Sequence, residues 1–293
     1  MPELPEVETV KIGLNKLIPG LKITEVSHDT PKSFPNAQAD VDQFLIGSGV
    51  VAVKRRAKIL LIELSSKYSL VVHLKMTGQM VYVGKERFGA GHPNESLIGS
   101  LPDKSTRVTI SFDNGAHLFF NDQRKFGWMR LIPTDEVSNI DFFKKLGPEP
   151  LAADFTAKDF KECLIRRVNS NIKAVLLDQT VIAGVGNIYA DESLWGAKIH
   201  PETVVKDLST VKINLLFKEL RYVLELSIEK GGSTDRNYVN AEGKKGSYMS
   251  FARVFRREGQ ACQRCGTTII KIRVAGRGTH LCPHCQKLKK AAK

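Results

Sequence analysis

The sequence has few of the features that mark secreted or membrane proteins. Only five of its 293 residues are cysteines, so disulfides are not expected to hold the fold together. No export signal is recognisable, and neither an apolar stretch long enough to span a bilayer nor a clear basic amphipathic helix is present. Internal repeats and low-complexity tracts are also absent. We therefore expect a cytoplasmic protein that does not bind membranes.

Acidic residues are scarce at the C-terminal end of the chain. Residues 236–293 contain fourteen lysines and arginines but only two acidic residues, whereas the whole chain carries a net charge of +13. Positive charge concentrated in this way is typical of a surface that binds a polyanion, and nucleic acid is the favoured partner. The alternative is a solvated basic tail, which suits the lysines after residue 286 better than Arg273 and Arg277.

Four of the five cysteines form two Cys-x-x-Cys pairs, at residues 262–265 and 282–285, and only Cys163 lies elsewhere. Two such pairs at this separation can place four thiolates tetrahedrally around Zn²⁺. The alternative is a set of redox dithiols or disulfides, which the intracellular composition disfavours. A site with four cysteine ligands has no open coordination position, so it folds the chain without taking part in chemistry. We predict one structural zinc, bound by Cys262, Cys265, Cys282 and Cys285.

Hydrophobic residues make up 42% of the chain, which is enough for two domains and a small zinc module. Apolar residues at helical spacing predict a helix over residues 4–17, and short β-rich runs from about residue 22 to 133 predict a β-sandwich or barrel. A stretch rich in Gly, Pro and Asn at 84–104 suggests a mobile surface insertion in that domain. After the Pro-bounded segment 146–150 the patterns become helical. The expected strands are 22–26, 50–55, 59–64, 70–74, 80–83, 107–112, 117–120 and 128–132, and the later helices are 157–166, 172–178, 187–197 and 207–230.

The segment Ala183-Gly184-Val185-Gly186-Asn187 lies between two of these expected helices. Glycines allow a backbone to approach a phosphate closely, and the amides at a helix start can bind an anion. A tight helix-to-helix turn would use the same glycines for a purely structural reason. The sequence alone leaves both interpretations open.

The N-terminus offers a reactive amine. The small residue after Met1 permits removal of that methionine, which would leave Pro2 as a free secondary amine. An α-amine has a pKa near about 8, so part of it is unprotonated at neutral pH and can act as a nucleophile. Attack on a sugar C1′ would displace the base and form an iminium, with Glu3 and Glu6 as nearby carboxylates. The alternative is an ordinary helix start in which Pro2 shapes the chain and the acids favour the first turn.

Motifs throughout the chain, taken together, decide between these alternatives. The start Met1-Pro2-Glu3-Leu4-Pro5-Glu6 closely resembles that of the bacterial formamidopyrimidine-DNA glycosylase family, also called 8-oxoguanine DNA glycosylases. The resemblance covers nearly the whole chain. It continues through residues 55–58, 73–78, 122–127, 146–151, 184–192 and 274–280 and the four cysteines. With Leu4, the sequence is more similar to the branch of the family that acts on purine lesions, because the endonuclease VIII branch usually has Gly at this position.

The resemblance implies an α+β multidomain fold that clamps damaged double-stranded DNA. A β-sandwich with flanking helices is followed by a helix-two-turns-helix domain and a four-Cys zinc finger built on a β-hairpin. The implied parts are a catalytic sandwich domain at 1–133, a linker at 134–152, the helix-two-turns-helix domain at 153–235, a lesion-capping loop and connection at 236–258, and the zinc finger at 259–293.

The resemblance also assigns roles to single residues. Pro2 would be the Schiff-base nucleophile, and Glu3 the acid and base that protonates the opened sugar. Lys58 would assist base loss or elimination, although in isolation it would be an ordinary turn lysine. Arg277 would grip phosphates beside the lesion and assist the final elimination. Phosphate contacts are expected from Lys173 and Asn187, and a DNA contact is expected from His73.

A base that leaves the duplex creates a gap that the protein must fill. The family resemblance implies that Met76 fills the void, Arg124 hydrogen-bonds the estranged base and Phe126 wedges the stack. Periodicity alone would instead place Met76 and Phe126 in the core of the sheet domain. Residues 233–255 correspond to the loop that closes over the flipped base, and their composition is that of a mobile loop.

Three features depart from the family pattern. Arg107 stands where the family commonly has a DNA-contacting histidine, so a phosphate contact is expected but a neutral imidazole role is not. The insertion at 84–104 exceeds the common length. Phe255 replaces a frequent tyrosine and lacks its hydroxyl.

These observations predict a bifunctional, monomeric DNA glycosylase and abasic-site lyase that removes oxidised purines, chiefly 8-oxoguanine and formamidopyrimidines. It would act on DNA of the bacterial nucleoid. An endonuclease VIII-like enzyme acting on oxidised pyrimidines is the nearest alternative. A non-catalytic zinc-finger protein that only binds DNA is the alternative from another class.

Overall fold

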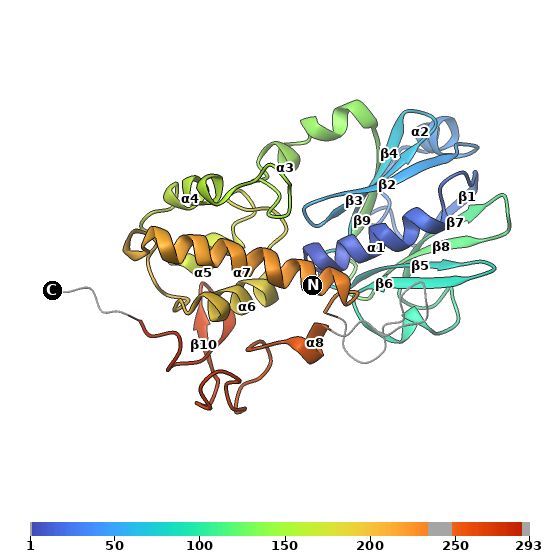
Figure 1. The fold of residues 1–293 in the computed structure, drawn as a ribbon. Helices are drawn as coiled ribbons and strands as arrows, with labels where there is room; N and C mark the ends of the chain where they lie inside the picture. Colours follow the sequence, from blue (N-terminus) through green and yellow to red (C-terminus); the bar gives the residue numbers. More distant parts are fainter. Residues whose placement is uncertain (1, 234–247, 289–293) are drawn as a thin grey trace. The chain divides into compact units, whose positions relative to one another are not determined.

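A computed structural model describes residues 2–233 and 248–288 of the chain (Figure 1). The chain divides into two compact units, which are treated separately below. The first unit consists of Met1–Lys144 and Ile228–Met249, and the second of Lys145–Ser227 and Ser250–Lys293. The division after Lys144 falls within the linker that we expected at 134–152.

The first unit contains a helix and two antiparallel sheets, as the sequence predicts. The helix is α1 (Leu4–Leu17). The five-stranded sheet has the order β1 (Ile23–His28), β7 (Thr106–Phe112), β8 (His117–Asp122), β5 (Gly78–Val83) and β6 (Arg87–Gly91). The four-stranded sheet has the order β2 (Val50–Arg56), β3 (Ile59–Leu64), β4 (Tyr68–His73) and β9 (Trp128–Pro133). Short helices complete the unit: α2 (Gln38–Asp40), η1 (Val41–Leu45), η2 (Glu95–Leu97), η3 (Thr134–Asn139) and α3 (Asp141–Lys144).

One continuous apolar core joins these parts. Leu60 and Val72 of the smaller sheet belong to the same buried cluster as Ile110 and Phe120 of the larger sheet, which is the arrangement of a β-sandwich. Helix α1 contributes Val7, Val10 and Leu14, whose three- and four-residue spacing gives the helix one apolar face. The helix contacts β2 and β6, which are edge strands of the two sheets. It therefore protects two edges that would otherwise be open to another chain.

The expected mobile insertion at 84–104 is wrong in part, because β6 lies within it. Phe88 of this strand is 2% exposed and packs against α1 at Gly13, where an added Cβ would lie 2.1 Å from the phenyl ring. The Arg87 guanidinium donates hydrogen bonds to three carbonyls of the insertion, at 2.6–3.3 Å. The sequence Arg-Phe-Gly-Ala-Gly lacks the β-branched residues typical of strands, so its pattern did not reveal the strand.

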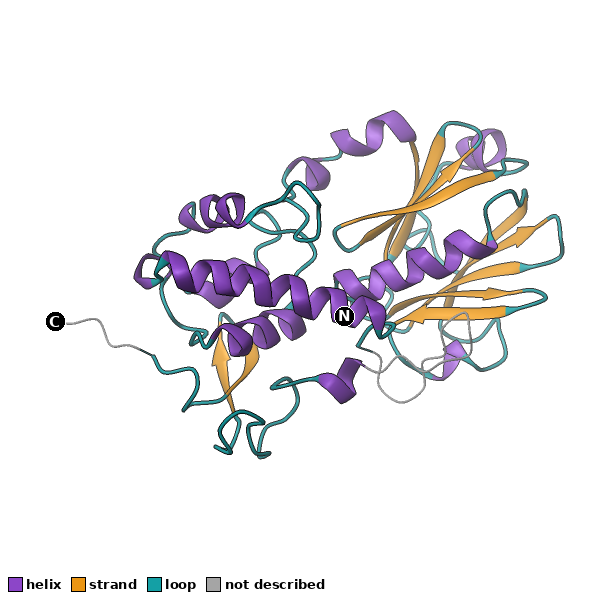
Figure 2. Cartoon of the chain, in the orientation of Figure 1, coloured by secondary structure: helices purple, strands orange, loops and turns teal. Residues whose placement is uncertain are grey.

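The second unit is helical and carries the C-terminal hairpin (Figure 2). Its helices are α4 (Ala157–Ile165), α5 (Ile172–Leu177), α6 (Asn187–Ala197), the short η4 (Val205–Asp207) and most of α7 (Thr210–Glu229). The short α8 (Tyr248–Phe251) lies at the boundary between the units. The hairpin consists of β10 (Ile270–Val274) and β11 (Arg277–Leu281). These elements confirm the predicted α+β class with a helical domain and a zinc-finger hairpin. Among residues 2–233 and 248–288, no helix combines the length and the apolar character needed to cross a membrane.

Candidate active site and metal centre

The start of α1 places Pro2 and Glu3 side by side at the helix N-terminus, where both are buried. Glu3 is the N-cap residue, and its backbone N–H donates to Glu6 Oε2 at 2.8 Å. The other oxygen of Glu6 accepts a hydrogen bond from the backbone N–H of Ser233, at 2.8 Å. Both oxygens of Glu6 therefore bind backbone amides, and the Glu3 side chain in turn accepts the backbone N–H of Glu6, so the two carboxylates form a capping box at the start of α1. Met1 lies outside the described residues.

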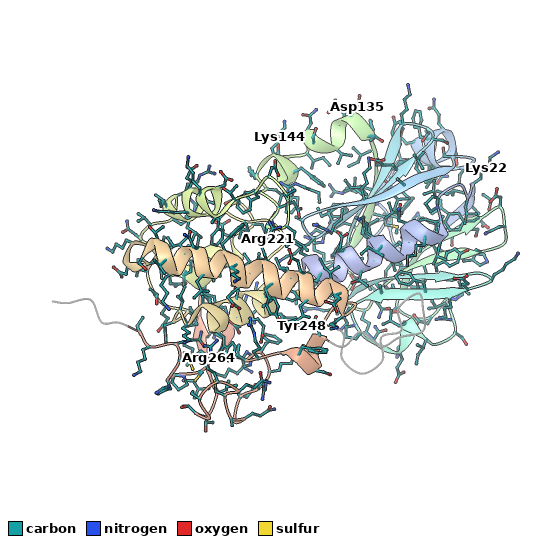
Figure 3. All side chains as sticks on the ribbon, in the orientation of Figure 1. Lys22, Asp135, Lys144, Arg221, Tyr248 and Arg264 are labelled. Carbon is teal, nitrogen blue, oxygen red and sulfur yellow. The ribbon has the colours of Figure 1, made fainter. Side chains whose placement is uncertain are left out.

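The same region holds the two ends of the segment 234–247, which lies outside the described residues. Ser233 is tied to Glu6, and the backbone N–H of Tyr248 donates to the carbonyl of Gly232 at 3.3 Å. Tyr248 is the first residue of α8 (Figure 3), and its side chain is buried. Residues 236–247 of the expected capping loop at 236–258 therefore lie outside the described residues, whereas Ser233 and Tyr248, which flank the segment 234–247, are both held near the start of α1.

Lys58 lies in the two-residue turn between β2 and β3 and is 8% exposed. The next residue, Ile59, pairs with His73 of β4, so Lys58 and His73 are neighbours in the four-stranded sheet. Burial, followed by the positive charges of Lys75 and Lys58, lowers the pKa of His73 to about 3. Its Nδ1 accepts a hydrogen bond from the Lys75 N–H at 3.1 Å. A neutral imidazole with an occupied Nδ1 carries its proton on Nε2, where it can donate to a phosphate oxygen.

We expect His73→Gln to flatten the pH dependence of stability between about pH 3 and pH 6.5. Unfolded His73 binds a proton below its ordinary pKa of 6.5, whereas the folded side chain does so only below about 3. The unfolded state thus holds the extra proton in this window, and stability rises with pH by at most about 1.4 kcal/mol per pH unit from this group. Urea unfolding at several pH values measures the slope. Exposed His28→Gln is the control, and an unchanged slope for His73→Gln would contradict the assignment.

Met76, Arg124 and Phe126 lie in two loops that Asp122 joins. Its Oδ2 accepts the N–H of Phe126 at 2.8 Å and of Gly127 at 2.7 Å, and its Oδ1 accepts the N–H of Arg124 at 3.2 Å. The hydroxyl of Thr77, the residue after Met76, also donates to Asp122. Asp122 is fully buried and was not predicted as a site residue. An Asp side chain that can accept the backbone N–H groups of residues two to five positions later is a turn signal, and this signal could have identified Asp122.

The side chains carried by these loops are accessible. Phe126 is 45% exposed, Arg124 is exposed and Met76 is half-buried, so none of the three is core. The Arg124 guanidinium lies 4.9 Å from the centre of the Phe126 ring, close enough for a cation–π contact. The core placement that periodicity favoured for Phe126 is therefore wrong, and Phe126 and Arg124 instead form an exposed aromatic–cation pair.

Arg107 is placed differently from its expected phosphate contact. It is 5% exposed, pairs with Asp29, and donates to the carbonyls of Asp122 at 2.8 Å and Lys104 at 2.6 Å. A guanidinium used in this way holds β7 to the turn after β8 and does not face solvent. The burial argues against a direct phosphate contact and for support of the loop that carries Arg124.

In the second unit, the β10–β11 turn presents Arg277. Ala275 and Gly276 form the turn with φ of 50° and 72°, the backbone typical of a tight two-residue hairpin. Arg277 follows them and is exposed. The amide Nδ2 of Asn187, at the start of α6, donates to the carbonyl of Gly278 at 3.0 Å. A side-chain amide has two N–H donors, so this contact leaves one for a phosphate oxygen. Asn187 therefore contacts the same hairpin that presents Arg277.

Lys173 also contacts this hairpin, but its side chain is buried in the protein interior. Its ammonium is fully buried, 2.6 Å from Asp191 Oδ1 and 2.6 Å from the Thr279 hydroxyl. Asp191 Oδ2 accepts the backbone N–H of His280 at 2.9 Å. The pair fastens α5 and α6 to β11, so the burial argues against the direct phosphate contact expected of Lys173. Asp191 was missed because a buried acid in a helix has no pattern of its own.

Asp191→Asn is expected to lower the free energy of unfolding of the second unit by about 3 kcal/mol, because it leaves the Lys173 ammonium buried without its counterion. The exposed pair Arg167–Asp178 provides the control, since Arg167→Gln should cost less than about 1 kcal/mol. Urea unfolding followed by tryptophan fluorescence compares the two variants. Equal losses would show that burial does not strengthen the dependence on Asp191.

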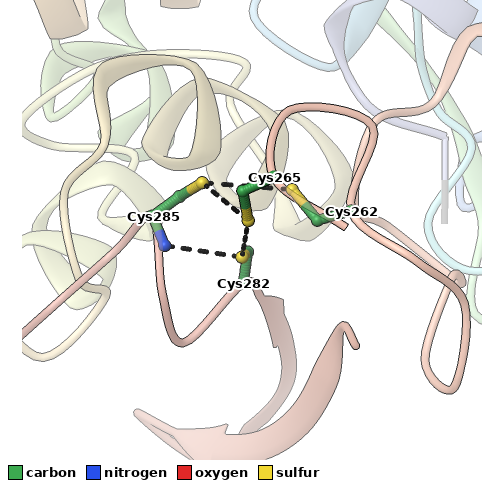
Figure 4. Close-up of side chains that lie close together, drawn as sticks. All are labelled: Cys262, Cys265, Cys282 and Cys285. Carbon is green, nitrogen blue, oxygen red and sulfur yellow. Dashed lines mark hydrogen bonds between the residues drawn. The ribbon is translucent and has the colours of Figure 1, made fainter. Parts of the chain in front are cut away.

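The four cysteines form the metal centre that their spacing predicts (Figure 4). All four sulfurs lie within 4.8 Å of one another, and individual pairs are 3.5–4.0 Å apart. Tetrahedral thiolates about 2.3 Å from one zinc ion would be about 3.8 Å apart, so the donor set fits Zn²⁺. A hydrogen bond from the Thr267 hydroxyl, followed by one from its backbone, lowers the pKa of Cys265 to about 5, which favours the thiolate that zinc requires.

The metal centre is packed onto α6. Cys262 and Cys282 belong to a buried cluster with Trp195, Val254 and Ile269. Arg264, between the first two cysteines, stacks on the Trp195 ring at 3.8 Å and donates to the Trp195 carbonyl at 3.1 Å. The finger therefore shares its core with the helical domain.

Three family descriptions match successive parts of the chain. Residues 1–129 match "Formamidopyrimidine-DNA glycosylase N-terminal domain", and residues 146–238 match "Formamidopyrimidine-DNA glycosylase H2TH domain". Residues 259–288 match "Zinc finger found in FPG and IleRS".

Curated relatives share the whole length of the chain. A formamidopyrimidine-DNA glycosylase from Pelotomaculum thermopropionicum is 41% identical over 290 residues, which is 99% of this chain and 100% of the relative. One from Streptococcus mutans is 41% identical over 288 residues, covering 98% and 100%.

Solved structures of similar proteins contain DNA. A point mutant of the Lactococcus lactis FPG, in complex with a Fapy-dG containing DNA, matches with a TM-score of 0.86 and 38% identity over 98% of this chain and 100% of that one. The wild-type L. lactis FPG in complex with an oxidised pyrimidine containing DNA matches with a TM-score of 0.84 and 38% identity over the same shares.

Proposed function

Because this chain belongs to the formamidopyrimidine-DNA glycosylase family and is a DNA glycosylase, we propose that it removes oxidised purines from duplex DNA and then cleaves the strand. The substrates are chiefly 8-oxoguanine and formamidopyrimidines in damaged double-stranded DNA. The protein acts as a monomer on DNA of the bacterial nucleoid in the cytoplasm. The basic C-terminal region, with fourteen cations against two acids, supports a DNA partner.

Base excision begins at the amine of Pro2 after removal of Met1. The nitrogen attacks the sugar C1′, the base departs with the electrons of the glycosidic bond, and the base gains a proton. Glu3 protonates the opening sugar at its ring oxygen, which leaves an iminium between Pro2 and C1′. The start of α1 is the observation that supports this proposal most, because it holds the amine of Pro2 and the carboxylate of Glu3 at adjacent buried positions.

Strand cleavage follows from the iminium. It acidifies the C2′ proton, whose removal expels the 3′ phosphate in β-elimination. Loss of the C4′ proton then expels the 5′ phosphate in δ-elimination, and water hydrolyses the Schiff base to free Pro2. Lys58 assists base loss or the first elimination, and Arg277 binds the phosphate that leaves in the final step.

Extruding the base costs a few kcal/mol in lost stacking, which the exposed loops of the first unit offset. Met76 fills the gap, Arg124 donates hydrogen bonds to the orphaned base and Phe126 wedges beside it. His73 and Asn187 bind phosphates, while Arg107 and Lys173 act on the DNA through the segments that they hold. The zinc ion takes part in no step and folds the finger that presents Arg277.

Borohydride trapping tests the proposal, because hydride reduces the iminium to a stable amine between protein and DNA. Protein that begins at Pro2 is mixed with duplexes containing 8-oxoguanine opposite cytosine, a formamidopyrimidine or thymine glycol. We expect an adduct that forms fastest with the purine lesions and that mass spectrometry locates on residue 2. Faster trapping on thymine glycol would instead support oxidised pyrimidines, the lesion class named for one structural relative. The absence of any adduct would leave only DNA binding.

A further inference from the structure

Arg55, at the end of β2, has no role in the chemistry described above, yet it lies beneath the turn that carries Lys58. Its Nη1 donates to the carbonyl of Ala57 at 2.9 Å, and its Nε donates to Glu8 Oε2 at 2.6 Å. The Arg55 side chain is 10% exposed and that of Glu8 is 16% exposed. One guanidinium therefore bridges the backbone of the Lys58 turn and a carboxylate of helix α1.

The turn itself needs this support. Ala57 has φ of 54°, in the left-handed region that costs a residue with a Cβ roughly 1–2 kcal/mol. Such a conformation persists where the surroundings hold it in place, and strained backbone of this kind tends to occur at functional sites. The bond from Arg55 to the Ala57 carbonyl holds the peptide group immediately before Lys58.

Glu8 connects the turn to the reactive end of the molecule. It lies five residues after Glu3 on the same helix, about 7.5 Å along the axis. Burial raises the pKa of Glu8, but hydrogen bonds from Lys11 and Arg55 outweigh this effect and lower it overall. Glu8 is therefore an anion at neutral pH, and its pairing with Arg55 links α1 directly to the turn.

We propose that Arg55 and Glu8 are positioning residues that fix the Lys58 ammonium relative to Pro2 and Glu3. This inference rests on the proposed function, because it needs Lys58 to act on the sugar or the departing base. Neither side chain touches the substrate. Their contribution is to keep the turn of β2 and β3 in register with the start of α1.

Single-turnover excision of 8-oxoguanine by Arg55→Gln tests the proposal. We expect a rate loss of about 10-fold, since small displacements of a catalytic group have effects of this size or larger. Glu8→Gln should show a similar loss, and Arg55→Lys, which keeps one donor, should restore part of the rate. Lys11 provides the matched control, because it also pairs with Glu8, at 2.8 Å, but has no bond to the turn. Lys11→Gln should remain within about twofold of the unchanged protein.

A double-mutant cycle with Lys58→Ala separates positioning from a general loss of structure. If Arg55 acts through Lys58, adding Arg55→Gln to Lys58→Ala should lower the rate by less than about twofold. Thermal unfolding and binding of abasic-analogue DNA check that the variants are folded and bind. The same 10-fold loss in the Lys58→Ala background, or a full rate for Arg55→Gln alone, would overturn the inference. Absence of a borohydride adduct with the unchanged protein would instead overturn the proposed function, so the two failures are distinguishable.

Discussion

A chain in which Pro2 is still preceded by another residue is expected to form no trapped adduct with 8-oxoguanine DNA. Its single-turnover excision should be at least about 1000-fold slower, because loss of the group that forms a covalent intermediate can cost more than this. An amide nitrogen has no available lone pair, so it cannot attack C1′. Pro2→Gly replaces the secondary amine with a primary amine and should trap more weakly than the unchanged protein without losing all reactivity.

The cleanest comparison uses one polypeptide. A removable N-terminal tag is placed directly before Pro2, and trapping, excision and DNA affinity are measured before and after the tag is cut away. Restoration of the adduct on cutting supports the amine as nucleophile. Affinity for abasic-analogue DNA should change far less than the rate, which separates chemistry from blocked access. Normal turnover with the tag in place would contradict the assignment of Pro2.

Removal of zinc is expected to have the largest effect on stability. Structural zinc contributes about 10 kcal/mol or more to the folding of small finger modules, and the four thiolates lie in a cluster that includes Trp195 of α6. A strong chelator or Cys282→Ser should therefore unfold the hairpin that presents Arg277 and sharply weaken DNA binding. Zinc content, hydrogen exchange over residues 259–288 and DNA affinity measure the outcome.

Cys163→Ser is the matched control for this experiment. Cys163 is a buried thiol of α4 that lies outside the four-cysteine cluster, so its loss should leave the zinc content at one ion per chain. The β-sandwich should remain folded after chelation, because its core contains none of the cysteines. Full DNA affinity for Cys282→Ser would show that the finger does not need its metal.

Local patterns predicted the regular elements well. The apolar spacing of residues 4–17 gave α1 with the bounds that the structure has, because a single buried face dictates its period. The cysteine spacing predicted the metal cluster for a similar reason, since two Cys-x-x-Cys pairs can supply the four ligands of a tetrahedral zinc site. Both features depend on short-range constraints that are written into neighbouring residues.

Features that depend on distant partners were not predictable in this way. Strand β6 contains no β-branched residue and is stabilised by Phe88, which packs against α1 at Gly13, 75 positions earlier. Lys173 and Arg107 are residue types that commonly contact DNA, but each is buried in an ion pair, with Asp191 and Asp29 respectively. The sequence does not show whether a charged residue faces a phosphate or a buried carboxylate, so only the tertiary structure separates the two cases.

The backbone hydrogen bond between Gly232 and Tyr248 joins two positions that are sixteen residues apart in the sequence. Ser233 binds Glu6 in the first turn of α1, so the described residues on either side of 234–247 lie close together beside that turn. A segment whose ends are already joined can gain or lose residues at small entropic cost, about 0.6 kcal/mol for each doubling of length. We therefore expect changes in the number of residues between Ser233 and Tyr248 to cost the fold little, whereas changes at Pro2 or Glu3 should alter the chemistry directly.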